Sequence, residues 1–534
     1  MVRPRPVPEA TWSFLRGAAA LSRLNPFTPE RRRAECALVG EASTDDETWS
    51  LRGDPRASEP RLVALGARLD AALDGLPSRL VGLDADEAVA LEEAILFAVF
   101  QRRAGALVAL VDADDGEAPV EVPWYPDLAA ELGRWASRFE RPRLLALPPE
   151  HLLAIGFQLR RAFVHVFESI VGGSRPAAAL RASSWASIVS CDVRRYLETT
   201  YGSLKDFSVL ITGPSGSGKE LVARAIGRAQ YRAFSPSTRT FAPSPFRALN
   251  PAALAPTLVE SELFGHAKGS FTGAVKDAEG WLETDGTVFL DEIGELDVML
   301  QVKLLRVLQT RTFERIGERT PRRFDGKLIA ATHRDLAAAI EAGRFRADLY
   351  YRLCADRVET PSLAAQLADR PSELGVLVDF IVGRLVGGGD ARAELAGEIT
   401  RWIEANLGLA YPWPGNVREL EQCVRNVMLK GRYVPLVRAS VSSAVGSAVD
   451  QAVPKPLDAA PVLEAPPRPL HPVAASLDAV LGDGPVPIDR VLEHYVSWVV
   501  ATTGSYVAAG RALEVDRRTI AARARAELVD VYTR

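Results

Sequence analysis

Cysteine is scarce in this sequence of 534 residues, where it occurs only at Cys36, Cys191, Cys354 and Cys423. The four positions are far apart and form no CxxC pair. This pattern argues against a structural zinc site and against a disulfide framework. Because unpaired cysteines are typical of a reducing compartment, we expect a cytoplasmic protein.

Long hydrophobic runs are also missing. No stretch reaches the roughly 20 apolar residues that a membrane span needs. The most apolar long helix that we expect, residues 151–171, carries Arg160 and Arg161 at its middle. The opening MVRPRPVPEATWSFLRG is interrupted by arginine and proline and has no apolar signal-peptide core. We therefore expect neither membrane contact nor a targeting segment in this sequence.

A strong charge of one sign is the third absence. The 64 lysines and arginines nearly balance the 68 aspartates and glutamates, which leaves a net charge of −4. Bulk charge therefore does not indicate nucleic acid, and any DNA contact must come from a local basic element. The composition that is present, 47% hydrophobic and 25% charged, is typical of globular domains, and the length suggests several of them.

The first third of the chain has helical periodicity. We expect residues 1–175 to be a mostly helical regulatory or sensory region of unknown type, in which the short apolar run Ala106–Val111 could form a strand. Residues 180–358 then alternate short apolar runs with helical segments. The runs at Val209–Ile211, Thr287–Leu290 and Lys327–Ala331 predict a parallel sheet covered on both faces.

The last part of the chain has three sections. Residues 359–432 are predicted to be all helical and to form a lid on the sheet domain. Residues 433–487 are rich in alanine and proline and predict an extended linker. Residues 488–534 return to a compact helical pattern.

A glycine-rich loop follows the strand expected at Val209–Ile211 and opens a helix. It fits the GxxxxGK pattern, which in this context predicts a phosphate loop rather than a plain glycine turn. Its backbone N–H groups and the helix N-terminus attract phosphate oxygens, and its lysine reaches the outer phosphates. The predicted nucleotide-binding residues are Gly213, Pro214, Ser215, Gly216, Ser217, Gly218, Lys219 and Glu220.

Polar pairs follow the next two expected strands. Asp291 and Glu292 come directly after Thr287–Leu290 and predict a Mg²⁺ held through water by Asp291 and an attacking water polarised by Glu292. Thr332 and His333 follow the strand at 327–331 and are predicted to sense the γ-phosphate. The alternatives are an acidic pair that caps a strand and an ordinary turn.

Arginines supply the remaining candidates. Arg346 and Arg352 could reach a neighbouring subunit's ATP as arginine fingers, or they could form a solvated basic helix face. Asn416 is predicted to cap the helix that follows it, with Glu419 at the capping-box spacing. Arg418 then lies in the first turn, from which it can reach phosphates.

Together these motifs resemble the central domain of the bacterial enhancer-binding proteins, which are AAA+ ATPases that activate sigma-54 RNA polymerase. The resemblance covers residues 180–432. The phosphate loop ends in Gly-Lys-Glu as it does in that family, which accounts for Glu220. A second run is similar to the family's GAFTGA loop, which contacts sigma-54, and it comprises Gly269, Ser270, Phe271, Thr272, Gly273 and Ala274.

Glycines at both ends of the 269–274 loop would make it a hinged loop. An exposed Phe271 and Thr272 at its tip would then contact the partner, whereas the alternative is a turn that buries Phe271. Ser270 stands where the family has alanine.

The resemblance also assigns roles in the nucleotide site. Asn250 matches the asparagine that restrains the catalytic glutamate, Arg346 and Arg352 match the two fingers, and Arg418 matches the second sensor. His333 replaces the family's sensor asparagine, and the segment 231–246 is longer than usual.

The end of the chain resembles the Fis-type helix-turn-helix domain that commonly closes these activators. The resemblance implies contacts with double-stranded DNA by residues of the recognition helix. These are Arg517, Arg518, Thr519 and Arg523. The alternative is a small helical docking domain.

The resemblance implies one fold and one function. The fold is α/β: an AAA+ parallel-sheet ATPase domain with a helical lid, a mostly helical N-terminal region and a C-terminal helix-turn-helix. The function is ATP hydrolysis, with Mg²⁺, by a homo-oligomeric ring, expected to be hexameric, that remodels the sigma-54 holoenzyme from an upstream enhancer site. Two alternatives stay open: a AAA+ remodeller of another protein, and a DNA-binding regulator with a decayed ATPase.

Overall fold

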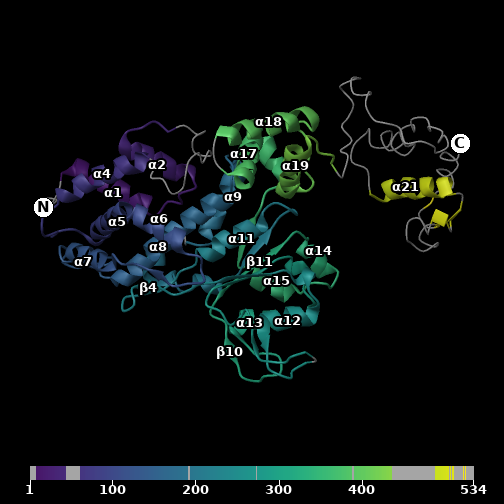
Figure 1. The fold of residues 1–534 in the computed structure, drawn as a ribbon, viewed down its shortest axis with the longest axis horizontal. Coiled ribbons are helices and arrows are strands. Elements are labelled where there is room, and N and C mark those ends of the chain that lie inside the picture. The colour runs from purple at the N-terminus through teal and green to yellow at the C-terminus, as the bar shows by residue number, and fades with distance from the viewer. Residues whose placement is uncertain are drawn as a thin grey trace. The chain divides into compact units, whose positions relative to one another are not determined.

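The computed structural model describes residues 8–43, 60–189, 193–271, 273–387, 390–435, 488–503, 505–506, 508–509, 521 and 524 (Figure 1). Two compact units divide the chain, Met1–Val441 and Ser442–Arg534. The predicted linker falls largely on residues outside this description. So do the four predicted DNA contacts, Arg517, Arg518, Thr519 and Arg523.

The N-terminal region is helical, as predicted. Its helices are α1 (Glu9–Leu21), α2 (Pro29–Val39), α4 (Pro60–Asp74), α5 (Ala85–Arg102), α6 (Ala104–Ala113), α7 (Tyr125–Ala136), α8 (Pro149–Ser169) and α9 (Arg175–Ala186). The strand suggested at Ala106–Val111 is wrong, because this run lies inside α6, which packs against α8. A short, continuous apolar run has no periodicity that separates a buried helix from a strand.

A five-stranded parallel sheet forms the centre of the first unit. Its order is β12 (Asp356–Glu359), β2 (Val209–Thr212), β11 (Lys327–Thr332), β8 (Thr287–Leu290) and β5 (Phe246–Leu249). Strands β2, β8 and β11 confirm the three predicted runs. All residues of β8 and β11 are buried, as expected for a parallel sheet with both faces covered. The predicted α/β fold is confirmed.

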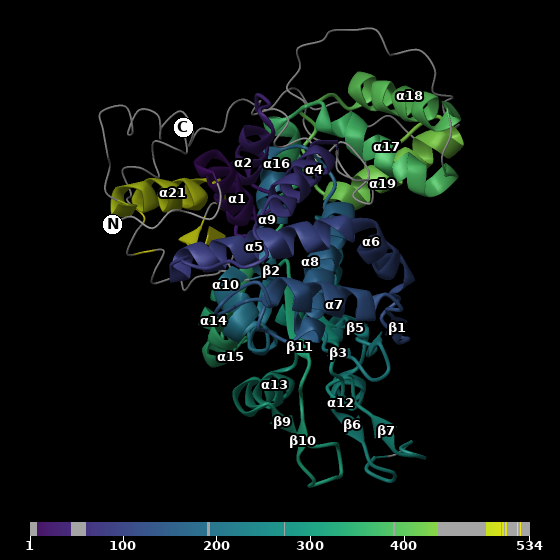
Figure 2. The ribbon, with the colours of Figure 1, turned by 90° about the vertical axis from the view of Figure 1, so that its left-hand side faces the viewer.

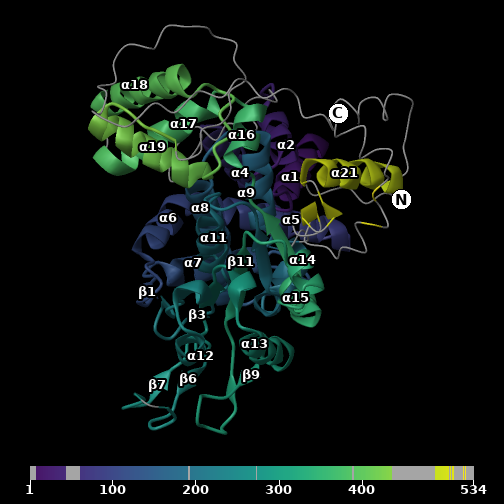
Figure 3. The same ribbon diagram turned by 90° about the vertical axis from the view of Figure 1, so that its right-hand side faces the viewer.

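Shorter elements surround this sheet. The helices are α10 (Val193–Arg195), α11 (Lys219–Arg228), α12 (Pro256–Phe264), α13 (Val298–Thr310), α14 (Leu336–Glu341) and α15 (Ala347–Leu353). Two hairpins pair β6 (Gly265–His266) with β7 (Ala278–Glu279), and β9 (Thr312–Phe313) with β10 (Arg322–Arg323). Figures 2 and 3 place both hairpins at the end of the α/β part opposite the lid helices.

The lid consists of α16 (Leu363–Asp369), α17 (Glu373–Val386), α18 (Asp390–Asn406) and α19 (Asn416–Lys430), which confirms its predicted helical character. The predicted cap of α19 is wrong by one residue. Gly415 is the N-cap, and Asn416 is the first helical residue, with a φ of 51°. Glu419 accepts a hydrogen bond from the Gly415 N–H at 2.8 Å. The Asn416 side chain is therefore free to serve elsewhere.

The N-terminal helices share a hydrophobic core with one face of the sheet. Buried residues of the helices, such as Trp12 and Ile155, belong to the same cluster as Ile211, Phe289 and Ile329 of the strands. A small antiparallel sheet adds a second connection, because β1 (Val120–Glu121) pairs with β4 (Thr240–Phe241), which pairs with β3 (Phe234–Ser235). The long 231–246 segment supplies β3 and β4 and thereby packs on the N-terminal region.

The described part of the second unit contains one long helix, α21 (Ile488–Thr503). Its buried Val496, Val499 and Val500 pack with Ala509. Among the described helices, none alone has the length and apolar character for crossing a membrane. The pair α5 and α6, bent by 61°, meets that test together, by length and composition only.

Candidate nucleotide-binding site

The phosphate loop runs from the end of β2 to the start of α11, as its sequence predicts. Gly213, Gly216 and Gly218 have φ values of 147°, 75° and 90°, in the region that favours glycine. A Cβ on Gly216 would lie 2.3 Å from the Gly415 carbonyl oxygen of the lid. Glycine at this position therefore lets the lid approach the loop closely.

Lys219 is buried at the first position of α11, and its ammonium group turns back over the loop. Nζ donates to the carbonyl oxygens of Gly213 at 3.1 Å and Pro214 at 3.2 Å. Burial lowers the pKa of Lys219, while the nearby Glu292 and Asp291 oppose this effect. Glu220 points the other way and is exposed, where it pairs with Arg224 at 3.1 Å.

The acidic pair lies beside this lysine because β8 and the phosphate-loop strand β2 both flank β11. Glu292 Oε1 is 3.9 Å from Lys219 Nζ. Burial raises the pKa of Asp291, and the charge of Glu292 raises it further. Glu292 has a left-handed backbone, with a φ of 53°. Such strain in a non-glycine residue is common at functional sites.

His333 closes the site from the end of β11. Its ring Nδ1 is 2.7 Å from Glu292 Oε2, and its backbone N–H donates to the same oxygen at 3.2 Å. Thr332 is fully buried, and its hydroxyl accepts from the Arg334 N–H. The two residues of the predicted sensor pair therefore lie in different environments. His333 contacts Glu292, and Thr332 is buried within the sheet.

Asn250 follows β5, and the register of Leu249 with Leu290 places it next to the acidic pair. Its side-chain oxygen accepts from the Ala252 N–H at 2.9 Å and caps a 3-10 turn over Pro251–Ala253. The restraint of Glu292 by Asn250 stays a prediction, because Glu292 is held here by His333.

Two residues that the sequence reasoning did not assign to the site join the lid to the phosphate loop. Asn416 donates from Nδ2 to the Ser215 carbonyl and accepts on Oδ1 from the Leu363 N–H, each at 2.9 Å. Thr360 Oγ1 lies 2.6 Å from the Ser217 hydroxyl. The sequence signal that could have identified them is a polar residue in each of the two segments that lead into α16 and α19.

Arg418 lies over the phosphate loop, as predicted. A Cβ added to Gly216 would lie 3.1 Å from the Cβ of Arg418. The positive charge of Arg418 contributes to lowering the pKa of Lys219. The site thus gathers two cations, Lys219 and Arg418, around the loop, with two carboxylates on the side of β8. This arrangement fits a polyphosphate on the loop, and Asp291 offers a carboxylate for Mg²⁺.

Arg346 is the N-cap of α15 and Arg352 lies in its last turn, and both are exposed. Arg346 makes two hydrogen bonds with Asp348, at 3.0 and 2.7 Å. Solvent access at both positions is compatible with contact to a second subunit, and their role as fingers stays a prediction.

The 269–274 loop joins β6 to β7 and has glycine at both ends, with φ values of 79° at Gly269 and 110° at Gly273. The Gly269 N–H donates to the Ala274 carbonyl at 2.8 Å, which closes the loop at its base. Phe271 is 40% exposed and touches only the edge of His266 among the described rings, with centroids 5.0 Å apart. The alternative in which Phe271 is a core residue is therefore wrong. Thr272 lies outside the described residues.

The second hairpin supports this loop. A Cβ on Gly317, which lies between β9 and β10, would be 2.6 Å from the Ser270 Cβ. The Ala267 N–H donates to the Ile316 carbonyl at 2.9 Å. The position where serine replaces the family's alanine therefore packs against the neighbouring hairpin, and the adjacent Phe271 is exposed.

Comparison with known proteins agrees with this geometry. Residues 192–359 match the family model of the sigma-54 interaction domain. The chain is 45% identical over 252 residues to the transcriptional regulatory protein ZraR of Escherichia coli strain K12, which covers 46% of this chain and 53% of ZraR. It is 44% identical over 237 residues to the Nif-specific regulatory protein of Azotobacter vinelandii, covering 44% and 42% of the two chains.

A third relative is the anaerobic nitric oxide reductase transcription regulator NorR of Aeromonas hydrophila, with 39% identity over 269 residues, covering 50% of this chain and 49% of NorR. The chain thus spans about half the length of the curated relatives that it matches.

The parallel sheet, the phosphate loop and the acidic pair under a helical lid define a nucleotide-binding domain of the AAA+ class. The match over residues 192–359 shows that this part of the chain is similar to sigma-54 interaction domains. The resemblance to the sigma-54-dependent enhancer-binding activators is thereby confirmed.

Proposed function

We propose that this protein is a sigma-54-dependent transcriptional activator that hydrolyses ATP to ADP and phosphate in order to remodel the RNA polymerase holoenzyme. The observation that carries the proposal is the combination, in one region that matches the sigma-54 interaction domain, of a phosphate loop beside an acidic pair and an exposed, glycine-flanked loop with Phe271. The first part supplies energy, and the second part presents a surface to a partner.

The residues of the site divide the chemistry among them. The phosphate loop and Lys219 bind and orient the phosphates, and Arg418 adds positive charge from the lid. Glu292 accepts a proton from, or orients, the attacking water. Mg²⁺ held near Asp291 would neutralise charge that develops on the phosphates.

His333 positions Glu292 by two hydrogen bonds to one carboxylate oxygen, which leaves the other oxygen 3.9 Å from Lys219. A donor that fixes the catalytic carboxylate is compatible with turnover. This observation supports an active ATPase over a decayed one.

We place Arg346 and Arg352 at the ATP of an adjoining subunit in a homo-oligomeric ring, which family resemblance makes hexameric. Their exposure supports this placement. We further propose that the C-terminal unit binds double-stranded DNA at an upstream enhancer, and that the protein acts in the cytoplasm.

The proposal is tested by measuring two activities of the full chain. One is Mg²⁺-dependent ATP hydrolysis, and the other is open-complex formation by sigma-54 holoenzyme at a promoter that carries an upstream binding site for this protein. Glu292→Gln should bind ATP but lose about 100-fold or more in turnover, and it should form no open complex. Glu314→Gln, an exposed residue of the second hairpin, is the control and should behave as the unaltered chain.

Active hydrolysis without any binding to sigma-54, in the presence of ADP and aluminium fluoride, would overturn the proposal and favour a different protein partner. Absence of hydrolysis together with intact DNA binding would favour the decayed ATPase.

A further inference from the structure

The N-terminal helical region, together with Arg370 of the lid, lines an open cavity of about 780 Å³ that the nucleotide chemistry does not use. Its apolar wall includes five aromatic side chains from α5, α8 and α9: Phe97, Phe100, Phe163, Phe167 and Trp185. A cavity of this size with a mainly apolar lining is typical of a small-molecule site.

The charged lining of the cavity is strongly unbalanced. Six arginines and two glutamates border it. The two glutamates are already paired, since Glu35 accepts from Arg31 and Glu93 forms ion pairs with Arg23 and Arg194 at 3.1 and 3.2 Å. The lining therefore carries an excess of positive charge.

Arg160 differs from the other arginines at the cavity. It lies on α8, directly after Leu159 and about one turn before Phe163, which both belong to the apolar wall of the cavity. Among the described residues, no carboxylate or carbonyl forms an ion pair or hydrogen bond with its guanidinium. Burial lowers the pKa of Arg160, and no neighbouring charge offsets this effect.

The Arg160 side chain is half-buried. A guanidinium that loses part of its hydration without gaining a partner is unfavourable, and such groups are normally paired. A ligand that supplied an anionic group here would gain a charge-assisted hydrogen bond in a partly dehydrated site. The aromatic wall would at the same time bury an apolar body.

We propose that this cavity binds an organic anion with an apolar body, and that Arg160 pairs with its acidic group. The site is a binding site for a regulatory small molecule, and this regulatory part rests on the proposed ATPase function.

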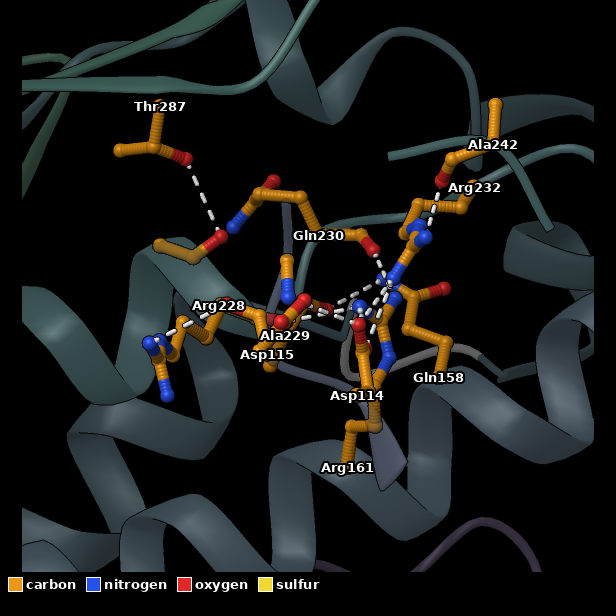
Figure 4. A network of polar contacts seen from close by, with 12 residues as sticks. Asp114, Asp115, Gln158, Arg161, Arg228, Ala229, Gln230, Arg232, Ala242 and Thr287 are labelled. Atoms are coloured by element: carbon orange, nitrogen blue, oxygen red, sulfur yellow. Dashed lines mark hydrogen bonds and ion pairs between the residues drawn. The ribbon is translucent and has the colours of Figure 1, made fainter. Parts of the chain in front are cut away.

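The position of Arg160 in α8 gives the ligand a route to the ATPase. The next residue, Arg161, points to the other side of α8 and donates to the carbonyl oxygens of Arg228, at 2.9 Å, and Gln230. These carbonyls lie at the end of α11, the helix that begins with Lys219 of the phosphate loop. Figure 4 shows this junction between α8 and α11, with Arg161 and Arg232 converging on Asp114.

A second route runs to the lid. Arg370, which also borders the cavity, donates to the Gly173 carbonyl at 3.1 Å, and the Gly173 N–H donates to Glu373 of α17 at 2.8 Å. A ligand in the cavity would thus contact residues that are bonded to both parts enclosing the nucleotide.

The experiment uses the full chain and two fluorescent probes of similar shape. The anionic probe is 8-anilinonaphthalene-1-sulfonate, and the uncharged probe is N-phenyl-1-naphthylamine. Titration without nucleotide should show one sulfonate site per chain. Arg160→Gln should weaken sulfonate binding by about 10-fold or more, because a charge-assisted hydrogen bond is lost. It should change binding of the uncharged probe by less than about 3-fold.

Three further variants keep the result interpretable. Arg16→Gln, an exposed arginine on α1 outside the cavity, should leave both probes unchanged. Arg160→Lys should retain most of the sulfonate affinity, and Leu159→Trp should weaken both probes by filling the cavity. Circular dichroism checks that each variant is folded. If Arg160→Gln fails to fold, Arg160→Lys and Leu159→Trp decide the question.

Multiple sulfonate sites per chain, or equal effects of Arg160→Gln and Arg16→Gln, would overturn the proposed site. Saturating sulfonate should also change ATP turnover in the unaltered chain and leave Arg160→Gln unaffected. Binding without any change in turnover would overturn the regulatory role, and a chain without ATPase activity would still report on binding.

Discussion

Nδ1 of His333 lies 2.7 Å from Oε2 of Glu292, so the residue that replaces the family's asparagine directly contacts the glutamate for which we propose the catalytic role. Because a carboxylate only accepts hydrogen bonds, this contact requires the proton on Nδ1. The backbone N–H of His333 supports the same oxygen at 3.2 Å. The substitution therefore keeps a side-chain donor at the end of β11.

This relationship predicts different outcomes for two substitutions of His333. His333→Asn keeps a donor and should retain ATP turnover within about 3-fold, whereas His333→Ala removes it and should lower kcat by about 10-fold or more. Steady-state hydrolysis at saturating ATP measures both. If alanine were tolerated as well as asparagine, positioning of Glu292 by the imidazole would be excluded.

The two hydrogen bonds of the Asn416 side chain predict that substitution of this residue weakens nucleotide binding. Asn416→Gly tolerates the positive φ of 51° but removes both bonds to Ser215 and Leu363. Loss of these two hydrogen bonds, each worth about 1 kcal/mol, should reduce ATP affinity by about 30-fold. Asn426→Gly on the same helix, whose amide bonds only its own helix among the described residues, is the control for nucleotide affinity.

Lys327 predicts a pH dependence of stability. It is 2% exposed at the start of β11, and burial lowers its pKa to about 8 from the ordinary 10.5. Between these pH values the unfolded chain holds a proton that the folded chain has released, so the free energy of unfolding should rise with pH. The full rise is on the order of 3 kcal/mol.

Denaturant unfolding between pH 7.5 and 9.5 measures this effect as the difference between the unaltered chain and Lys327→Met. Lys205→Met, which removes a 43% exposed lysine, is the control and should leave the pH dependence unchanged. Parallel pH profiles for the unaltered chain and Lys327→Met would contradict the assignment.

The buried cluster in Figure 4 predicts that the N-terminal region stabilises the ATPase part. Asp114 pairs with Arg161 at 3.4 Å and with Arg232 at 2.7 Å, and all three side chains are at most 5% exposed. Asp114→Asn leaves two buried guanidinium groups without a carboxylate and should lower the free energy of unfolding by about 3–5 kcal/mol.

An exposed ion pair between the same two parts of the chain serves as the matched control. Glu117 pairs with Arg247 at 3.5 Å, and both side chains are about half exposed. Glu117→Gln should change stability by less than about 1 kcal/mol. Similar effects of Asp114→Asn and Glu117→Gln on the free energy of unfolding would show that the buried cluster stabilises the protein no more than the exposed ion pair does.

Local patterns in the sequence predicted much of the sheet and the nucleotide site. Short apolar runs at 209–211 and 287–290 were followed by glycines or acids, and the carboxyl ends of parallel strands bring such residues together. The failure at Ala106–Val111 has a physical reason, since every residue of the run is apolar, including the exposed Ala109, and such a run shows no polar periodicity.

Contacts between distant parts of the chain were beyond this reasoning. Asn416 is 201 positions from Ser215, and Arg232 is 118 positions from Asp114. The asparagine suggested only a helix cap, and neither member of the ion pair stood out from other charged residues. The cavity could not be predicted for the same reason, because it forms only where Arg160 and aromatic residues of three helices come together in the fold.

The most direct test of the account compares Phe271→Ala with Val275→Ala, an 80% exposed residue just beyond the same loop. The account predicts that Phe271→Ala keeps ATP hydrolysis within about 2-fold and abolishes open-complex formation with sigma-54 holoenzyme, since coupling and chemistry lie on separate elements. Val275→Ala should retain both activities. Equal loss of hydrolysis and open-complex formation in Phe271→Ala would contradict the account.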